Sequence, residues 1–393
     1  MNTHLIKHPK IIFAASKYAF GDVKRDFSTE YQSFFYALKK RYKKIHYFNT
    51  YNKTQSIKNI NKKFLKYCIK NKPDYIFMSL ATYEIYIETL VQIKNELNTV
   101  LINWCSDDSW RFEQHSGIYA PYFDVNITTD FDAYNKFKKF KTFPILSNWG
   151  CPDQWLTSVK PEKKCKFDVI FIGSSYMGRK KIINYLQDSG IKVQCFGHGW
   201  KNGSVKSKKI PNLMNNAKIC LNFSKSRGVK RQLKARPFEI TGSGSLCLTE
   251  DSPQLGKFFN KSKDIITFSS KKDLKNKIIF FLKNKDKRDK IAKSGFLKCK
   301  NNYIYSHIID AIFNKILEHK FSKKKYKEIK TNLNTFIFAK LIKNILFFLF
   351  KLFVGKTKSL KIVRRFFFEI EWRFRKKHIY SKSGWTSNLF NLI

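Results

Sequence analysis

Basic side chains and one glutamate gather in the segment 223–240, FSKSRGVKRQLKARPFEI. Its five cations within ten positions are Arg227, Lys230, Arg231, Lys234 and Arg236. Guanidinium groups suit a diphosphate because their forked N–H donors match its oxygens. Glu239 follows Pro237, which presets φ for a helix start, and its carboxylate is placed to accept hydrogen bonds from a ribose diol. The segment therefore indicates a nucleotide-diphosphate site. The alternative is a first-turn helix acid beside a solvated basic face.

Glycine-containing turns lie on both sides of this segment. FIGSSYMGRKK (171–181) ends a strand at Gly173, passes through Ser174 and enters a helix, and backbone N–H groups at such a turn favour a phosphate. The motif is neither a P-loop nor a full GxGxxG, so an ordinary strand-to-helix turn is an equal alternative. After the glutamate, the chain turns through Gly242 and Gly244 into a second apolar run.

Acids that close a strand in the first half are the candidates for acid–base chemistry. In SDDSW (106–110), Asp107 and Asp108 follow an apolar run, and one of them could take the proton of an acceptor hydroxyl. Adjacent residues of a strand point to opposite faces, so at most one is expected to face a substrate. His115 is an alternative base. The other interpretation is that these residues cap the following turn.

No metal site is predicted. None of the eight cysteines forms a C-x-x-C pair, which excludes zinc and thioredoxin-like sites of that type. Several cysteines lie in apolar runs such as SLCLT (245–249), which is typical of buried thiols in a reducing compartment. The first residues, MNTHLIKHPKIIFAAS, lack the apolar stretch of a secretory signal. We therefore expect a cytoplasmic protein.

Strand-like runs alternate with helical segments along most of the chain. In the first half, strands are predicted at 11–16, 74–80, 99–107, 124–129 and 143–149, with helices over 28–42 and 82–96. The pattern restarts near 167, with strands at 193–197, 218–223, 245–250 and 264–270 and helices at 271–284, 286–297 and 304–320. Such alternation is typical of parallel sheets with crossover helices.

Two successive series predict an α/β protein of two Rossmann-like lobes that face each other across a cleft. The expected domains are an acceptor-side lobe over 1–150, a nucleotide-binding lobe over 151–320 and a basic helical tail over 321–393. The hinge is expected near NWGCPDQWL (148–156), where Gly150 and Pro152 interrupt the pattern.

The tail is strongly basic, with eighteen Lys and Arg against three Glu over 321–393. In TFIFAKLIKNILFFLFKLFVG, Lys340, Lys343 and Lys351 share one helical face, and three lysines make spanning a bilayer costly. A helix lying in the interface of an anionic membrane fits better. In the next segment, one face is expected to carry Ile362, Val363, Phe366, Phe367, Ile370 and Phe374. The alternative is that both helices pack on the protein's own core.

The whole chain has 77 Lys and Arg, 29 Asp and Glu, and a formal net charge of +48. Such a charge suggests a polyanionic partner. The lysines are spread along the chain, however, and compositional drift toward Lys, Asn and Ile explains that better. No nucleic-acid-binding module is recognisable, so nucleic acid is not expected as a partner.

The segment LKARPFEITGSGSLCLTE, with NFSKS before it and LKNKDKRDKIAKSGF after it, resembles the carboxy-terminal half of the CgeB-like glycosyltransferases, which are named for a spore-maturation protein. FDVIFIGSSYMGRKKIINYL and VQCFGHGW are similar to the start of that lobe, and residues 102–129 resemble the end of the amino-terminal lobe. The resemblance spans roughly residues 10 to 315. It implies the GT-B fold, with a nucleotide-sugar donor on the second lobe and an acceptor facing the first.

Carried over by position, the resemblance implies a set of donor-binding residues. They are Gly173, Ser174, Lys230, Arg231, Arg236, Glu239, Gly242 and Gly244. Glu239 would contact the ribose, while Arg236 and nearby Lys230 or Arg231 would face the diphosphate. The small residues would let the donor approach the backbone. The wider GT-B pattern has two glutamates eight residues apart, and Arg231 stands at the first position here. We do not interpret Glu250 as a replacement, because it ends a strand.

The function implied is transfer of a hexosyl group from a nucleoside-diphosphate-sugar, the co-substrate, to a hydroxyl of a surface glycan, lipid or protein. No metal or other cofactor is expected, because protein cations can stabilise the leaving diphosphate. The tail would hold the enzyme at the inner face of the plasma membrane. A non-catalytic GT-B scaffold is the alternative because of the missing glutamate, and a basic nucleic-acid-binding protein is a weaker one.

Overall fold

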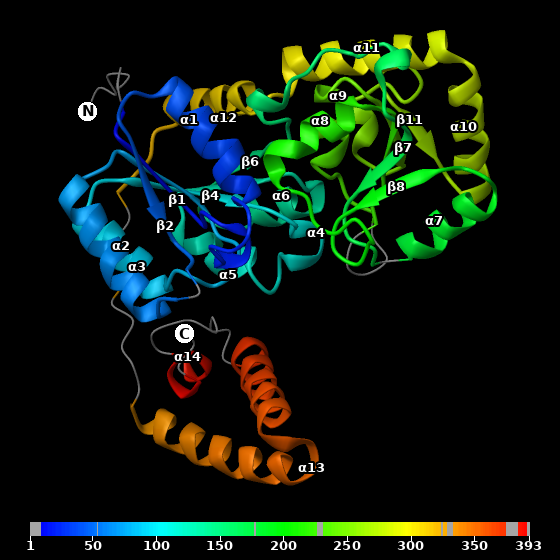
Figure 1. The fold of residues 1–393 in the computed structure, drawn as a ribbon. Coiled ribbons are helices and arrows are strands. Elements are labelled where there is room, and N and C mark those ends of the chain that lie inside the picture. Colours follow the sequence, from blue (N-terminus) through cyan, green and yellow to red (C-terminus); the bar gives the residue numbers. More distant parts are fainter. Residues whose placement is uncertain are drawn as a thin grey trace. The chain divides into compact units, whose positions relative to one another are not determined.

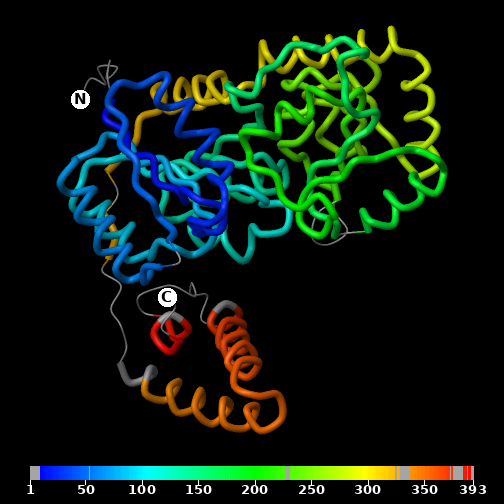
Figure 2. Tube along the Cα trace, in the orientation of Figure 1, coloured from blue at the N-terminus to red at the C-terminus, as the bar shows by residue number. Residues whose placement is uncertain are grey.

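The computed structural model describes residues 9–52, 54–176, 178–225, 231–323, 325–327, 333–374 and 384–390. The chain divides into two compact units. Unit 1 comprises Met1–Tyr31, Tyr42–Leu146 and Ile316–Ile393, and unit 2 comprises Gln32–Arg41 and Ser147–Lys315. Figure 2 traces the chain through both. Each unit is thus assembled from segments that are far apart in the sequence.

Six parallel strands form the sheet of unit 1, in the order β2-β1-β3-β4-β5-β6 (Figure 1). They are β1 (Ile11–Ala15), β2 (Ile45–Asn49), β3 (Tyr75–Ser79), β4 (Val100–Cys105), β5 (Val125–Thr128) and β6 (Phe143–Leu146). Every residue of β1 and β3 is buried, as expected for central strands of a parallel sheet covered on both faces. The edge strand β2 was not predicted, because its half-buried residues show no apolar run.

The helices of unit 1 before the tail are α2 (Ile57–Asn71), α3 (Ile87–Glu96), α4 (Asp108–Arg111), α5 (Ser116–Tyr119) and α6 (Phe131–Phe137). The helix predicted over 82–96 begins only at Ile87. The cause is the Glu84 carboxylate, which accepts the N–H groups of Ala81 (2.8 Å) and Thr82 (2.7 Å) and holds a turn there.

The helix predicted over 28–42 lies on the division between the units. Ser28 Oγ accepts the N–H of Tyr31 (3.1 Å), and a π-helical turn, Tyr31–Phe35, then leads into α1 (Tyr36–Arg41). Within unit 2, the Phe34 ring lies 5.0 Å from that of Tyr305. These contacts explain why residues 32–41 cluster with the second unit, although the sequence pattern places them in the first lobe.

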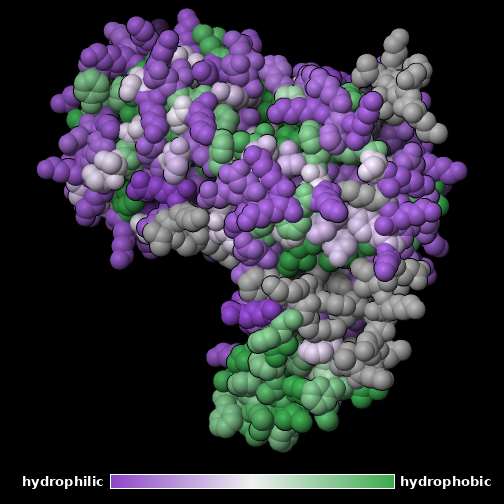
Figure 3. Space-filling view, turned by 180° about the vertical axis from the view of Figure 1, so that it is seen from behind, coloured by the Kyte–Doolittle hydropathy of each residue, from purple (hydrophilic) through white to green (hydrophobic). Residues whose placement is uncertain are grey.

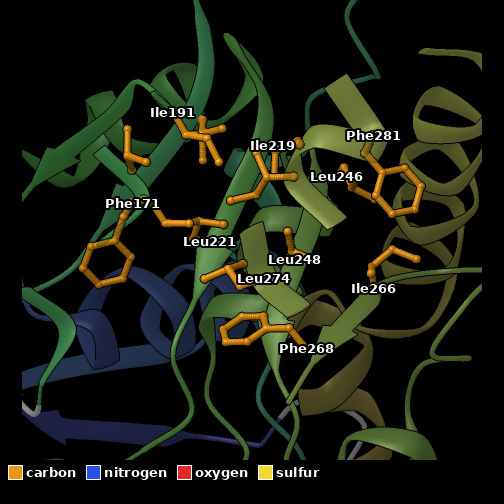
Figure 4. Close-up of a cluster of buried hydrophobic side chains, with 14 of the residues drawn as sticks. Phe171, Ile191, Ile219, Leu221, Leu246, Leu248, Ile266, Phe268, Leu274 and Phe281 are labelled. Atoms are coloured by element: carbon orange, nitrogen blue, oxygen red, sulfur yellow. The ribbon is translucent and has the colours of Figure 1, made fainter. Parts of the chain in front are cut away.

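Five parallel strands form the sheet of unit 2, in the order β11-β10-β9-β7-β8. They are β7 (Phe167–Ile172), β8 (Val193–Phe196), β9 (Ala217–Asn222), β10 (Leu246–Glu250) and β11 (Ile266–Phe268). Successive residues of β7 enter different cores, as strand geometry requires. Val169 and Phe171 pack in the cluster of Figure 4, whereas Ile170 and Ile172 join a second cluster.

The helices of unit 2 after α1 are α7 (Arg179–Asp188), α8 (Ile210–Asn215), α9 (Arg236–Gly242), α10 (Lys271–Lys283) and α11 (Lys285–Asn302). Most of α12 (Tyr305–Glu318) also belongs to unit 2, and its end from Ile316 belongs to unit 1. Leu186 of α7 and Ile278 of α10 pack in the first cluster, and Phe238 of α9 packs in the second. Both units are therefore parallel sheets covered by helices on both faces, which confirms the prediction of two Rossmann-like α/β lobes.

The tail contains α13 (Leu333–Arg373) and α14 (Trp385–Leu389). Gly355 has φ 75° and ψ 166°, so α13 is two helical arms joined by a break. Among the described residues, no helix combines the length and the apolar character needed to cross a bilayer. The apolar face predicted for the second arm is divided: Val363 and Phe367 are buried, whereas Ile362 and Phe366 are exposed. The cause is a small core within the tail, which takes up one side of the arm.

Candidate functional site

Charged side chains converge in unit 2 near the carboxyl ends of β7, β9 and β10, where open parallel sheets bind ligands. Arg179 opens α7 after β7, Arg236 opens α9 after β9, and Glu250 ends β10. Strands β7, β9 and β10 are adjacent in the sheet, and Arg179 is electrostatically coupled to both Arg236 and Glu250. We call the set Arg179, Arg231, Arg236, Glu239 and Glu250 the guanidinium cluster.

Arg236 and Glu239 form an ion pair within the first turn of α9. Arg236 Nη1 lies 2.7 Å from Glu239 Oε2, and the glutamate side chain is only 8% exposed. Burial raises the pKa of Glu239, and the guanidinium of Arg236 opposes that rise. The contact is close but lacks hydrogen-bond alignment, since Nη1 makes no hydrogen bond within the described part of the chain. Nη1 itself is buried, so a ligand could reach only the exposed remainder of the Arg236 side chain, which is 24% exposed in all.

Arg179 is the site residue that the sequence pattern missed. It is 9% exposed, and its Nη1 donates to the Ser174 carbonyl (3.1 Å). The guanidinium lies over the rings of Phe171 (5.6 Å) and Tyr176 (5.0 Å). Burial lowers the pKa of Arg179, and Arg236 adds to that effect. Its place as the first helical residue after a glycine turn, in YMGRKK, is the signal that could have identified it.

Glu250 accepts hydrogen bonds from the loop that follows β9. Its Oε2 accepts the N–H groups of Ser224 (3.0 Å) and Lys225 (3.1 Å), and its Oε1 lies 3.4 Å from Arg231 Nε. Arg231 is therefore in the cluster, but its partner Glu250 also holds the loop in place. This geometry supports the interpretation of Glu250 as the structural end of a strand. Lys230 lies outside the described residues.

The loop after β7 is bound to the loop after β8. The Gly173 N–H donates to the Phe196 carbonyl (2.8 Å), and Trp200 Nε1 donates to the Gly173 carbonyl (2.7 Å). A Cβ on Gly197, whose φ is +129°, would lie 2.4 Å from the Gly173 oxygen. Both polar groups of the Gly173 backbone are thus used inside the protein. Approach of a donor to Gly173 and Ser174 stays a prediction.

Gly242 and Gly244 are buried, and packing within the protein explains why both positions are glycine. A Cβ on Gly242 would lie 2.4 Å from Cys151 Sγ. Gly244 has φ +72°, and a Cβ there would lie 2.5 Å from the Thr157 carbonyl oxygen. The lack of a side chain at both glycines lets the segment 151–158 pack against the end of α9. Their contact with a donor stays a prediction.

Asp107 and Asp108 lie beyond the carboxyl end of β4 in unit 1. Asp107 has a left-handed backbone (φ +62°) and is half-buried. Asp108 is 6% exposed and accepts a hydrogen bond from Ser116 Oγ. Burial raises the pKa of Asp108 to about 7, although the hydroxyls of Ser116 and Thr128 oppose the rise. The two acids therefore lie in different environments, but strand alternation is not the cause, because β4 ends at Cys105 and Asp108 is the first residue of α4.

His115 is a neutral, buried side chain. It is 4% exposed, and its Nε2 lies 2.7 Å from the carbonyl oxygen of Thr82, so Nε2 carries the donated hydrogen. Burial lowers its pKa to about 3, and Arg111 contributes to that shift. Its ring also lies 5.2 Å from the rings of Tyr83 and Tyr119. These contacts give His115 a structural task, and a role as base stays untested.

Glu30 and Glu84 are two further acids near Asp107 that the sequence pattern missed. Burial raises the pKa of Glu30, and Glu84 and Asp107 raise it further. Burial also raises the pKa of Glu84, which has no exposed surface. The signal for Glu84 was an acid shortly after the buried strand β3, whereas Glu30 lies well beyond the end of β1, after Asp22 and Asp26, and has no such signal. The carboxyl edge of this sheet is therefore acidic, whereas that of unit 2 carries the guanidinium cluster.

Within the described residues, no group of three or more His, Cys, Asp and Glu side chains is placed to hold a metal ion. Asp130 and Asp132 have the Asp-x-Asp spacing seen in some metal sites. Asp130 Oδ1, however, accepts the N–H of Ala133 (2.9 Å) and caps α6. Asp130 therefore serves the start of a helix.

Residues 179–314 match the protein-family model described as glycosyl transferase-like. This range begins at Arg179 and contains the whole guanidinium cluster. No curated protein matches the chain.

The fold is similar to solved structures of glycosyltransferases. For Alr3699/HepE of Anabaena in complex with UDP and glucose, the TM-score is 0.58 at 11% identity, covering 79% of this chain and 100% of that chain. For the same protein in complex with UDP-glucose, the TM-score is 0.52 at 12% identity, covering 79% and 99%. For sucrose-phosphate synthase of Thermosynechococcus elongatus, it is 0.52 at 10% identity, covering 78% and 99%. These likenesses establish the GT-B fold, and the family match supports glycosyl transfer.

Proposed function

We propose that this protein is a glycosyltransferase of the CgeB-like type, which moves a hexosyl group from a nucleoside-diphosphate-sugar to a hydroxyl of a surface glycan, lipid or protein. The observation that carries the proposal is the guanidinium cluster. Arginines that are distant in sequence gather with Glu239 at the carboxyl edge of the sheet in unit 2. All five residues of the cluster lie within the stretch matched by the glycosyl transferase-like model.

The cluster suits both halves of a nucleotide diphosphate. Glu239 is placed to accept hydrogen bonds from the ribose diol, and Arg236 can keep its ion pair with Glu239 while other N–H groups reach the phosphates. Arg179 adds a second guanidinium, which Phe171 and Tyr176 hold in place. When the bond from the anomeric carbon to the phosphate oxygen breaks, negative charge builds on the leaving diphosphate. Fixed cations in a partly buried site stabilise that charge.

Transfer is proposed to need no metal, because the guanidinium groups supply the positive charge where the diphosphate leaves. It needs no cofactor beyond the donor itself. The proton of the acceptor hydroxyl would pass to a carboxylate of unit 1. Asp107 is proposed for this role over Asp108 and His115, because those two are buried and bound to Ser116 and Thr82. The enzyme would work in the cytoplasm at an anionic membrane, where lipid-linked acceptors reside.

A thermal-shift panel of UDP-, GDP-, CMP- and dTDP-sugars tests the proposal. A bound donor stabilises the native state by mass action, by about 2.7 kcal/mol at a concentration one hundred times Kd. UDP-sugars come first in the panel, because the Anabaena structures hold UDP and UDP-glucose. We expect one donor class to raise the Tm. If no donor raised it, the proposal would fail and the non-catalytic scaffold would stand.

A further inference from the structure

The tail is a helical hairpin with a small core of its own. Ala339 of the first arm of α13, Val363 and Phe367 of the second arm and Leu389 of α14 form its buried core. Side chains on one side of the first arm pack against that core, and they are Ile342, Leu346, Phe347 and Phe350. The two arms and α14 thus form one element, and the residues left outward are fixed by its own packing.

Hydrogen bonds from both arms hold α14. Glu371 of the second arm, which has no exposed surface, accepts the N–H groups of Trp385 and Thr386 at the start of α14. Lys343 of the first arm donates from Nζ to the Leu389 carbonyl (2.8 Å) at its end. An acid at the start and a cation at the end of a helix both complement its dipole. One of the lysines expected to face lipid phosphates is therefore used inside the hairpin.

The opposite side of the first arm is apolar and exposed. Its exposed residues recur every three or four positions, and their exposed fractions run from 38% to 83%. They are Ile337, Phe338, Leu341, Ile345, Phe348, Leu349, Leu352, Phe353 and Val354. Figure 3 shows the corresponding hydrophobic area at the lower end of the view. We call this set the apolar face. Contiguous exposed apolar side chains of this kind mark an interaction site.

The charge around the apolar face is positive. Residues 333–374 hold nine Lys and Arg and two Glu. Both glutamates are used inside the hairpin: Glu371 caps α14, and Glu369 pairs with Arg365 and with Arg373 (3.1 Å). The exposed cations next to the break include Lys351, Lys356, Lys358 and Lys361. The hairpin therefore presents bulky apolar side chains beside cations whose charge is not balanced locally.

We infer that the apolar face docks on an anionic lipid bilayer, with the first arm lying in the plane of the interface and the lysines of the second arm near lipid phosphates. Large apolar side chains beside an excess of Lys and Arg are typical of interfacial helices. A second copy of the chain is a poorer occupant, because pairing two such hairpins brings like charges together. The docking specifies the membrane contact of the proposed function, but it does not require sugar transfer to occur.

Co-sedimentation of the full-length protein with vesicles tests this surface. We expect binding to vesicles of phosphatidylcholine and phosphatidylglycerol, and binding at least about tenfold weaker to phosphatidylcholine alone, since each lysine near an anionic surface contributes about 1 kcal/mol. The triple variant Leu341→Gln, Phe348→Gln, Leu352→Gln should lose binding to both. The matched control is Ile279→Gln, Phe280→Gln, Leu297→Gln, which removes three exposed apolar side chains of unit 2 and should bind like the wild type.

A second pair of variants tests the charge. Lys356→Gln, Lys358→Gln, Lys361→Gln should abolish the preference for phosphatidylglycerol, whereas Lys272→Gln, Lys283→Gln, Lys290→Gln should keep it; all six lysines are exposed. Wild-type binding by the apolar-face variant, or no vesicle binding by the wild type, would overturn the inference. So would a dimer in light scattering that only the apolar-face variant disrupts, since the occupant would then be a second copy.

Donor thermal shifts on the same proteins separate this inference from the proposed function. If no donor shifts the wild type while vesicle binding follows the pattern above, the transferase proposal fails and the docking surface stands. If donors shift all variants equally and none binds vesicles, the docking surface fails and the transferase proposal stands.

Discussion

Arg236 Nη1 lies 2.7 Å from Glu239 Oε2 in the first turn of α9, and the two side chains are 24% and 8% exposed. A carboxylate this deeply buried is costly unless a cation accompanies it. Burial raises the pKa of Glu239 and Arg236 opposes the rise, so the arginine favours the charged form that a ribose diol needs as an acceptor. The pair is therefore already assembled at the carboxyl edge of the sheet.

Glu239→Gln tests the ribose contact. The amide keeps the size of the side chain but is a weaker acceptor, and it leaves Arg236 without its counter-ion. We expect donor affinity to fall by about tenfold to a hundredfold, because hydrogen bonds to charged groups contribute about 1.5–3 kcal/mol. Isothermal titration with the donor that gives the largest thermal shift measures this.

Asp273→Asn is the matched control for Glu239→Gln. Asp273 is also a first-turn acid with a cationic partner, Lys277 (2.9 Å), but it lies on α10. Donor affinity should be unchanged in this variant. If the Glu239→Gln protein folded and bound the donor with wild-type affinity, Glu239 would not contact the ribose.

Arg179→Met and Arg179→Lys test the buried guanidinium. Methionine should weaken donor binding by about tenfold or more, and lysine should restore part of it, because a charge remains but the forked donors are lost. The exposed neighbour Lys180 supplies the control, Lys180→Met, which should bind like the wild type. Equal affinities for Arg179→Met and Lys180→Met would show that the guanidinium faces no phosphate.

Asp108→Asn tests the buried acid through the pH dependence of stability. Its folded-state pKa is raised from 3.8 to about 7, so the folded protein binds a proton that the unfolded chain has released. The wild type should therefore lose stability relative to Asp108→Asn as the pH rises from 3.8 to about 7. The loss is on the order of a few kcal/mol, since one pKa unit is worth about 1.4 kcal/mol. Chemical denaturation across that range measures it.

For Asp273→Asn, the stability of the wild type relative to the variant should change with pH in the opposite direction. Burial acts to raise the pKa of Asp273, but the hydrogen bond from Lys277 and other contacts outweigh it and lower that pKa. The stability that Asp273 contributes is present above its ordinary pKa of 3.8 and is lost as the pH falls below that value. For Asp108, the contrary result is a difference in the free energy of unfolding between the wild type and Asp108→Asn that does not change with pH. That result would exclude a buried, protonated Asp108.

Chelation tests whether transfer needs a metal. With the guanidinium groups supplying positive charge at the diphosphate, kcat should stay within about twofold when EDTA is present, a change of under 0.5 kcal/mol in barrier. A loss of activity that Mg²⁺ or Mn²⁺ restores would contradict the metal-independent reaction.

Much of the fold could be predicted because buried parallel strands leave apolar runs in the sequence. The runs IIFAA of β1 and FDVIFI of β7 are examples. Strand β2 and the placement of residues 32–41 could not be predicted. The side chains of β2 are half-buried, and residues 32–41 are placed by tertiary contacts such as that of Phe34 with Tyr305.

The candidate site was predicted where local sequence decides it and missed where tertiary packing does. Pro237 and the first turn of α9 bring Arg236 and Glu239 together within four residues, so their pairing follows from sequence. Arg179 lies more than fifty positions earlier, and only the order of strands in the sheet makes it their neighbour. Gly242 must be glycine because the Cys151 thiol packs against it, and no local sequence pattern predicts that contact.

The most direct measurement is the release of nucleoside diphosphate from a panel of nucleotide-sugars by the full-length protein, with water or an added hydroxyl compound as acceptor. We predict release from one donor class by the wild type and by Asp273→Asn, and release at least about tenfold slower at a subsaturating donor concentration with Glu239→Gln. No release from any donor by the wild type, or equal rates for all three proteins, would contradict it.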